Sequence, residues 1–204
     1  MDVKIKICGL RRKEDILTAN RLRPDYVGFV FAPGSPRCVS REEAIQLRQL
    51  LDPGIRAVGV FVNENIRTVA GLLADGIIQE AQLHGQENEN YILSLQRMTG
   101  RHLIKAFRVE NSADVGRAAA SNADCILLDH GTGGTGESFD WDLVQGLTRP
   151  YFLAGGLNAD NVQEALRQTR PWGVDVSSGV ETDGVKDAQK MEQFVRCVRE
   201  LQRG

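Results

Sequence analysis

The chain has 204 residues, of which 42% are hydrophobic and 25% are charged, a composition that predicts one globular domain over residues 1–204. The formal net charge of -2 argues against nucleic-acid binding, and no apolar run approaches the ~18 residues of a membrane span. Four cysteines without a CxxC pair predict free thiols rather than disulfides or a zinc site, and hence a cytoplasmic protein.

Short apolar runs alternate with amphipathic helical patterns along the whole chain. The eight expected strands are residues 3–8, 26–31, 56–62, 77–83, 102–107, 125–129, 151–155 and 173–177. Between them, Ser40 and Glu43 form a capping-box pattern at a helix start, and Ile66, Val69, Ala70 and Leu73 follow helical spacing.

Eight strand–helix units predict an α/β fold, a small single-domain (βα)8 TIM barrel. The competing architecture is an open doubly wound sheet, whose first strand usually leads into a GxGxxG turn. Here that turn reads CGLRRKE and holds one glycine. The pattern therefore favours the barrel, without an inserted domain.

Side chains alternate along a strand, so Lys4, Lys6 and Cys8 share one face and Val3, Ile5 and Ile7 share the other. In a barrel the apolar face packs on the helices, and the polar face is directed to the axis. Cys8 then lies at the carboxyl-terminal rim, where barrel enzymes carry their chemistry. The same parity directs Asp129 inward at the rim end of the sixth strand.

Lys6 is expected one layer below Cys8, and two interpretations remain open. Its charge could support a Cys8 thiolate. Alternatively, it could pair with an interior carboxylate such as Glu80 and only neutralise buried charge.

Glycine-rich segments follow three of the late strands. Asp129 precedes HGTGGTGES, which predicts a rim loop that moves or closes on a ligand. The seventh strand ends in AGGL with Gly155 and Gly156, and the eighth leads into SSGV with Ser178 and Gly179. Loops after strands seven and eight commonly bind phosphate in this fold, so the substrate is expected to be a phosphorylated small molecule.

Taken together, these segments resemble the phosphoribosylanthranilate isomerase family of tryptophan biosynthesis. The resemblance covers essentially the whole chain, through KICGL, GFVFAPGSPRCV, VGVFVNE, QLHG, KAFRV, LLDHGTGGTGESFDW, LAGGLNADNV and GVDVSSGVETDGVKD. It implies an aldose–ketose isomerase that performs an Amadori rearrangement without cofactor or metal, as a monomer or homodimer. Arg11 departs from the threonine frequent in the family at that position, at the start of the first helix and outside the named roles.

The resemblance implies that Cys8 is the general base, Asp129 the general acid and Arg37 the ligand of the anthranilate carboxylate. It also implies that Gly155, Gly156, Ser178 and Gly179 hold the phosphate. We add His84, expected as a hydrogen-bonded rim residue, and Asp175, which would contact either substrate hydroxyls or interior donors.

Three rival functions remain. The histidine-pathway aminoimidazole isomerase works with a carboxylate at the end of its first strand, where this chain has Cys8. Ribulose-phosphate epimerases hold a metal between His and Asp ligands, which three scattered histidines fit poorly. A non-catalytic phosphometabolite-binding barrel would bind ligand without turnover, and the presence of both Cys8 and Asp129 argues against it.

Overall fold

The computed structural model describes residues 3–129 and 141–203. Eight parallel strands pair in chain order and close into a barrel. They are β1 (Lys4–Cys8), β2 (Tyr26–Val30), β3 (Arg56–Phe61), β4 (Glu80–Leu83), β5 (Leu103–Arg108), β6 (Cys125–Asp129), β7 (Tyr151–Leu153) and β8 (Gly173–Val176). The predicted fold class is confirmed.

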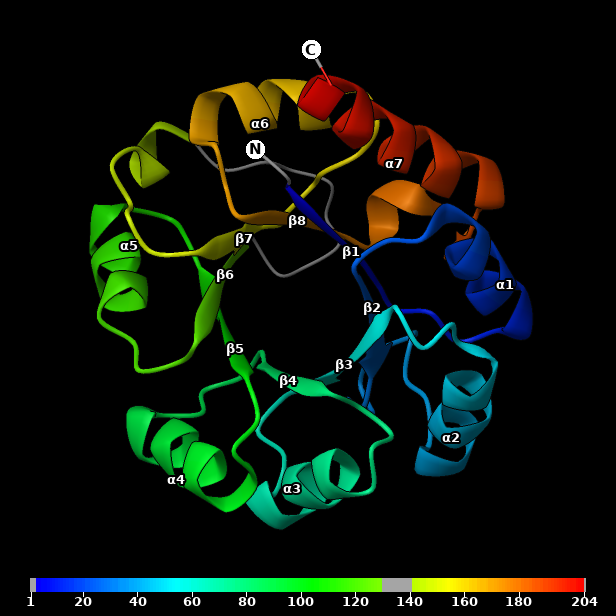
Figure 1. Ribbon diagram of the computed structural model, residues 1–204. Coiled ribbons are helices and arrows are strands. Elements are labelled where there is room, and N and C mark those ends of the chain that lie inside the picture. Colours follow the sequence, from blue (N-terminus) through cyan, green and yellow to red (C-terminus); the bar gives the residue numbers. More distant parts are fainter. Residues whose placement is uncertain (1–2, 130–140, 204) are drawn as a thin grey trace.

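Helices surround the ring of strands, as Figure 1 shows along the barrel axis. They are α1 (Lys13–Leu22), α2 (Arg41–Leu50), α3 (Ile66–Ala74), α4 (Glu89–Thr99), α5 (Ser112–Ala119), α6 (Val162–Thr169) and α7 (Ala188–Arg203). Short 3-10 turns occur at Trp141–Val144 (η1) and Ser178–Val180 (η2). Among the described residues between β6 and β7, η1 is the helical element, where the regular pattern would have an α-helix.

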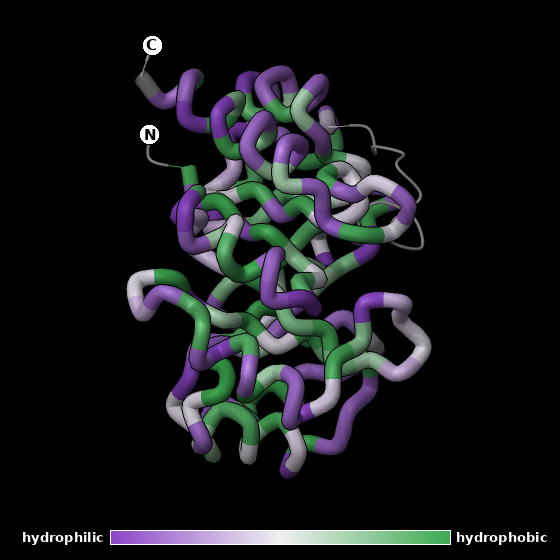
Figure 2. The backbone as a smooth tube through the Cα atoms, turned by 90° about the vertical axis from the view of Figure 1, so that its right-hand side faces the viewer, coloured by the Kyte–Doolittle hydropathy of each residue, from purple (hydrophilic) through white to green (hydrophobic). Residues whose placement is uncertain are grey.

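The core has two parts, as expected for a barrel. Ile5 and Ile7 belong to the outer cluster between strands and helices, whereas Tyr26, Leu127 and Phe152 belong to a separate inner cluster. Hydrophobic and hydrophilic stretches alternate along the tube in Figure 2, as expected for helices that bury one face. Among the described residues, no helix combines the length and apolar composition that crossing a bilayer requires.

Local hydrogen bonds explain where α2 and β4 begin. The Ser40 hydroxyl accepts from the Glu43 amide at 3.1 Å and the Glu43 carboxylate accepts from the Ser40 amide at 2.7 Å, which confirms the capping box of α2. The predicted fourth strand started too early, at residue 77. The Ile78 amide is directed back to the Leu72 carbonyl of α3 at 3.4 Å, so pairing as β4 begins at Glu80.

A two-stranded hairpin that the sequence patterns did not predict follows η2. It consists of β9 (Glu181–Thr182) and β10 (Val185–Lys186), which pair antiparallel. Asp183 and Gly184 at its turn both have positive φ, of 52° and 73°. An Asp-Gly pair is a strong hairpin signal because such turns need positive φ, so the sequence did contain the information.

Candidate active site

Cys8 is the last residue of β1 and lies opposite Gly28 of β2. The cysteine is 7% exposed. A Cβ atom at position 28 would lie 2.6 Å from the Cys8 sulfur, so the glycine leaves the space that the thiol occupies. Burial raises the pKa of the Cys8 thiol above its ordinary value, although Lys6 and Lys186 act in the opposite direction. The predicted inward position of this cysteine at the rim is confirmed.

Lys6 is fully buried, and its ammonium lies 2.8 Å from Asp175 Oδ1. The two residues are directly opposite on neighbouring strands, because the register of β1 and β8 pairs Lys6 with Asp175. Burial lowers the pKa of Lys6, but Asp175 and Cys8 outweigh this effect and the pKa is raised overall. The sequence analysis was thus right that Lys6 pairs with an interior carboxylate, and wrong in suggesting Glu80, because the partner is Asp175.

Glu80, the partner suggested from the sequence, lies elsewhere in the barrel. Its carboxylate contacts Arg56 Nη1 of β3 at 2.6 Å, since Glu80 starts β4 next to that strand. Parity predicts which face a side chain occupies, whereas its partner depends on strand register, which the sequence alone does not give.

Asp129 ends β6 and is 9% exposed. Its Oδ2 lies 3.5 Å from His84 Nε2, and His84 Nδ1 lies 3.1 Å from the Gln82 amide nitrogen. If that amide donates to Nδ1, His84 carries its proton on Nε2 and directs it at Asp129. Gln82 was not predicted as a site residue, although alternation along β4 places it on the same face as Glu80.

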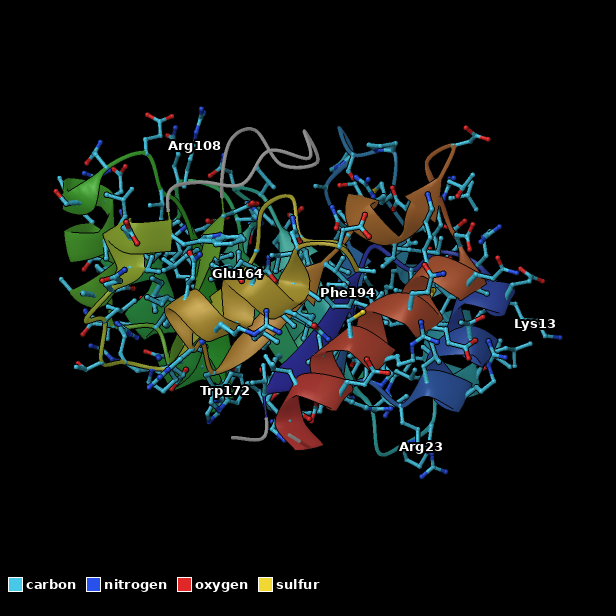
Figure 3. The ribbon with its side chains drawn as sticks, turned by 90° about the horizontal axis from the view of Figure 1, so that it is seen from above. Lys13, Arg23, Arg108, Glu164, Trp172 and Phe194 are labelled. Carbon is cyan, nitrogen blue, oxygen red and sulfur yellow. The ribbon has the colours of Figure 1, made fainter. Side chains whose placement is uncertain are left out.

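A cavity of about 550 Å³ opens at this end of the barrel. Such a volume is typical of small-molecule sites. Cys8 and Asp129 line it together with Gln82, His84, Asp175, Ser177 and the loop from Ala32 to Arg37. In Figure 3, Arg108 at the end of β5 and Trp172 before β8 mark opposite ends of the barrel, and the cavity lies at the Arg108 end.

A second, smaller cavity of about 50 Å³ adjoins the first, because Asp129, Asp175 and Ser177 line both. The four predicted phosphate residues, Gly155, Gly156, Ser178 and Gly179, line it. The prediction therefore grouped these residues correctly. The glycine-rich run after Asp129 falls at residues 130–140 and lies outside the described residues.

Backbone geometry explains the glycines of the small cavity. Gly155 and Gly156 have φ of 84° and 65°, values that favour glycine. A Cβ atom at Gly179 would lie 1.9 Å from the Leu157 carbonyl oxygen, so the two loops can approach only if this residue lacks a side chain. The glycines therefore allow the two loops to meet at the small cavity.

Arg37 lines the large cavity from the loop between β2 and α2. Its Nε and Nη2 donate to the two carboxylate oxygens of Glu181 at 2.7 and 2.6 Å. Neither Glu181 nor Lys186, which pairs with it, was assigned a role from the sequence. The Asp-Gly turn could have revealed the hairpin, whereas its contact with Arg37 depends on tertiary structure.

Comparisons with known proteins agree over the whole barrel. The family model described as N-(5'-phosphoribosyl)anthranilate (PRA) isomerase matches residues 5–197. The N-(5'-phosphoribosyl)anthranilate isomerase of Endomicrobium trichonymphae is 46% identical over 202 residues, covering 97% of this chain and 99% of the relative.

Solved structures give the same result. Phosphoribosyl anthranilate isomerase from Thermotoga maritima has a TM-score of 0.90 and 38% identity, covering 97% of this chain and 99% of the other. A structure of such an isomerase in complex with reduced 1-(o-carboxyphenylamino)-1-deoxyribulose 5-phosphate has a TM-score of 0.87 and 36% identity, with coverages of 97% and 99%. The barrel, its cavities and these matches lead to one conclusion: this chain belongs to the N-(5'-phosphoribosyl)anthranilate isomerase family.

Proposed function

We propose that Cys8 is the general base and Asp129 the general acid of the family's reaction. That reaction converts N-(5'-phosphoribosyl)anthranilate into 1-(2-carboxyphenylamino)-1-deoxyribulose 5-phosphate in tryptophan biosynthesis. The observation that carries the proposal is that both residues, from β1 and β6, line one cavity that continues into a glycine-lined recess. The sugar would span the larger cavity with its phosphate in the recess.

The rearrangement needs one acid and one base. Asp129 donates its proton to the furanose ring oxygen as the bond from that oxygen to C1' breaks, which opens the ring to a Schiff base. Cys8, as thiolate, then removes the proton from C2', and the resulting enolamine tautomerises to the ketone. His84, 3.5 Å from Asp129, holds the carboxyl in place, and Asp175 contacts substrate hydroxyls while it pairs with Lys6.

The two charged ends of the substrate have separate binding groups. Arg37 binds the anthranilate carboxylate, because a guanidinium matches a carboxylate in geometry and charge. Gly155, Gly156, Ser178 and Gly179 hold the phosphate through groups that line the small cavity. We also propose that the protein is cytoplasmic and that it is a monomer or a homodimer. Size-exclusion chromatography with light scattering would test the oligomeric state.

The test is turnover by two variants that keep the shape of the site. Cys8→Ala and Asp129→Asn should each reduce kcat by roughly two to four orders of magnitude, the scale expected for loss of one acid or base. The loss of substrate fluorescence, followed in a metal-free buffer, measures the rate. Both variants should retain the circular dichroism spectrum of the parent.

Cys125→Ala is the matched control, because Cys125 is also buried in the barrel interior but lies in the inner apolar cluster. It should turn over at close to the parental rate. Near-normal turnover in Cys8→Ala would remove Cys8 from the mechanism, and ligand binding without turnover by the parent would favour the non-catalytic rival.

A further inference from the structure

The hairpin formed by β9 and β10 is fixed to the barrel at the active-site end, and it follows η2 in Figure 3. Arg12 Nη2 donates to the Lys186 carbonyl at 2.7 Å, which ties β10 to the start of α1. Lys190 Nζ donates to the Glu181 carbonyl at 2.7 Å, which ties β9 to α7. The side chains of the hairpin are therefore presented from a supported backbone.

Glu181 directs its carboxylate at Arg37, and its side chain is 6% exposed. The two bonds occupy Nε and Nη2, which form one edge of the guanidinium. They fix the plane of the group as well as its position, as paired parallel bonds do. Glu181 raises the pKa of Arg37, so the arginine stays charged.

Lys186 completes the cluster beneath the hairpin, with a side chain that is 1% exposed. Its ammonium pairs with Glu181 and donates to the Ser177 carbonyl at 3.0 Å. A buried carboxylate is stable only when it is paired, and Glu181 has two cationic partners. Burial alone would raise the pKa of Glu181, but the bonds from Arg37 and Lys186 reverse this effect and lower it.

The cluster of Arg37, Glu181 and Lys186 thus contains two cations and one anion, and carries one net positive charge. Within residues 3–129 and 141–203, the Nη1 atom of Arg37 has no hydrogen-bond acceptor, and the residue lines the large cavity. The edge between Nη1 and Nη2 is therefore open to a second carboxylate.

We propose that Glu181 is a positioning residue that makes the site selective for a carboxylated aryl amine on the sugar. It fixes Arg37 so that the free edge of the guanidinium faces the substrate carboxylate, and Lys186 balances its charge. This proposal rests on the proposed function, in which Arg37 binds that carboxylate. An arginine side chain loses rotamer freedom when it binds a ligand, and Glu181 removes this loss in advance by holding the guanidinium in place.

The experiment compares Glu181→Gln with the parent on two substrates. One is N-(5'-phosphoribosyl)anthranilate, and the other is its carboxyl-free aniline counterpart. For the anthranilate compound, KM should rise about tenfold in the variant with kcat changed less than about threefold, since one oriented charge-assisted contact is weakened. For the aniline compound, KM should stay within about twofold, so the preference for the anthranilate compound, taken as the ratio of the two KM values, should fall at least about fivefold.

Two further variants define the cause. In an Arg37→Ala background, Glu181→Gln should have no additional effect on KM, because Glu181 acts only through Arg37. Glu192→Gln is the matched control: Glu192 pairs with Arg21 at 3.6 Å on the exposed surface, and its loss should leave both substrates unaffected.

Should Glu181→Gln fail to fold, Glu181→Asp keeps the charge opposite Lys186 and shortens the side chain by one methylene. It should show the same selective rise in KM. An unchanged preference between the substrates in a folded variant, or an equal rise for both, would overturn the proposal. A parent that does not turn over the anthranilate compound would instead refute the proposed function.

Discussion

Opposing influences act on the Cys8 sulfur. Burial raises the pKa of the thiol, Lys6 lowers it, and Asp175 raises it again. The net pKa lies above the ordinary value, so the free enzyme holds mostly neutral thiol at neutral pH. Lys6 pairs with the interior carboxylate of Asp175, as the second interpretation made from the sequence expects in kind, and the support of a Cys8 thiolate by Lys6 stays a prediction.

The pH profile tests this balance. The thiolate fraction increases as pH rises through the raised pKa of Cys8. In the parent, kcat/KM should therefore still climb with pH above the ordinary thiol pKa of about 8.5. Lys6→Met removes a charge that lowers the thiol pKa, so the rise should move to higher pH. Lys6→Met/Asp175→Asn removes both opposing charges and should give a smaller displacement.

A second measurement follows the Cys8 thiol directly, as the rate of its alkylation by iodoacetamide at each pH. Peptide mass spectrometry identifies which cysteine has been alkylated. Cys125 serves as the internal reference, since burial raises its pKa to about 12 and it should react slowly throughout. A Cys8 profile that is identical in Lys6→Met and the parent would contradict a role for Lys6 in supporting the thiolate.

At the scale of elements, the site depends on how closely two loops approach. The loop after β7 and the turn η2 meet where Gly179 passes the Leu157 carbonyl. The motifs AGGL and SSGV predicted that both loops would line a phosphate site, because the loops after barrel strands seven and eight commonly bind phosphate and small residues let the backbone approach an anion. The hairpin that supports Arg37 was signalled by its Asp-Gly turn, whereas its contact with Arg37 could not be predicted because it joins residues far apart in the sequence.

Gly179→Ala should weaken phosphate binding. The added Cβ would lie 1.9 Å from a backbone oxygen, so one loop must shift and the cavity must change shape. We expect KM for the substrate to rise by at least ~10-fold, the cost of a displaced charge-assisted contact, with a similar loss of inhibition by inorganic phosphate.

Gly116→Ala is the control for that substitution. Gly116 lies in α5, and beyond its chain neighbours and the backbone of its own helix no heavy atom lies within 4 Å of the position that an alanine methyl group would take. Alanine should therefore stabilise the helix by about 0.5–1 kcal/mol and leave KM unchanged. An unaltered KM in folded Gly179→Ala would separate this glycine from the phosphate site.

At the scale of the whole molecule, the alternation of strands and helices was enough to predict the barrel. The spacing of apolar residues indicates which face of each strand and helix is buried. Eight strand–helix units can bury all of these faces in few arrangements, and a closed barrel is one of them. It did not predict that η1 would be the helical element described between β6 and β7, nor how the barrel interior is closed at the end opposite the site. There Glu80 pairs with Arg56, near Tyr26.

Glu80 should make the stability of the barrel depend on pH. Burial raises its pKa above the ordinary value, although Arg56 partly opposes this. A carboxyl group with a raised pKa in the folded state contributes stability below its unfolded pKa, and that contribution is lost as pH rises through the folded pKa. Ionised Glu80 therefore lowers the free energy of unfolding at neutral pH.

Glu80→Gln removes this ionisation and leaves Arg56, which is 55% exposed, in contact with water. The difference in free energy of unfolding between the variant and the parent, measured by urea denaturation, should change with pH. It should shift in favour of the variant by on the order of 1 kcal/mol as pH rises from about 4 to 7. Glu110→Gln is the control, because Glu110 pairs with Arg108 where both side chains are 55% exposed. Its difference from the parent should stay flat across that range, and a flat difference for Glu80→Gln as well would mean that Arg56 fully compensates the buried carboxylate.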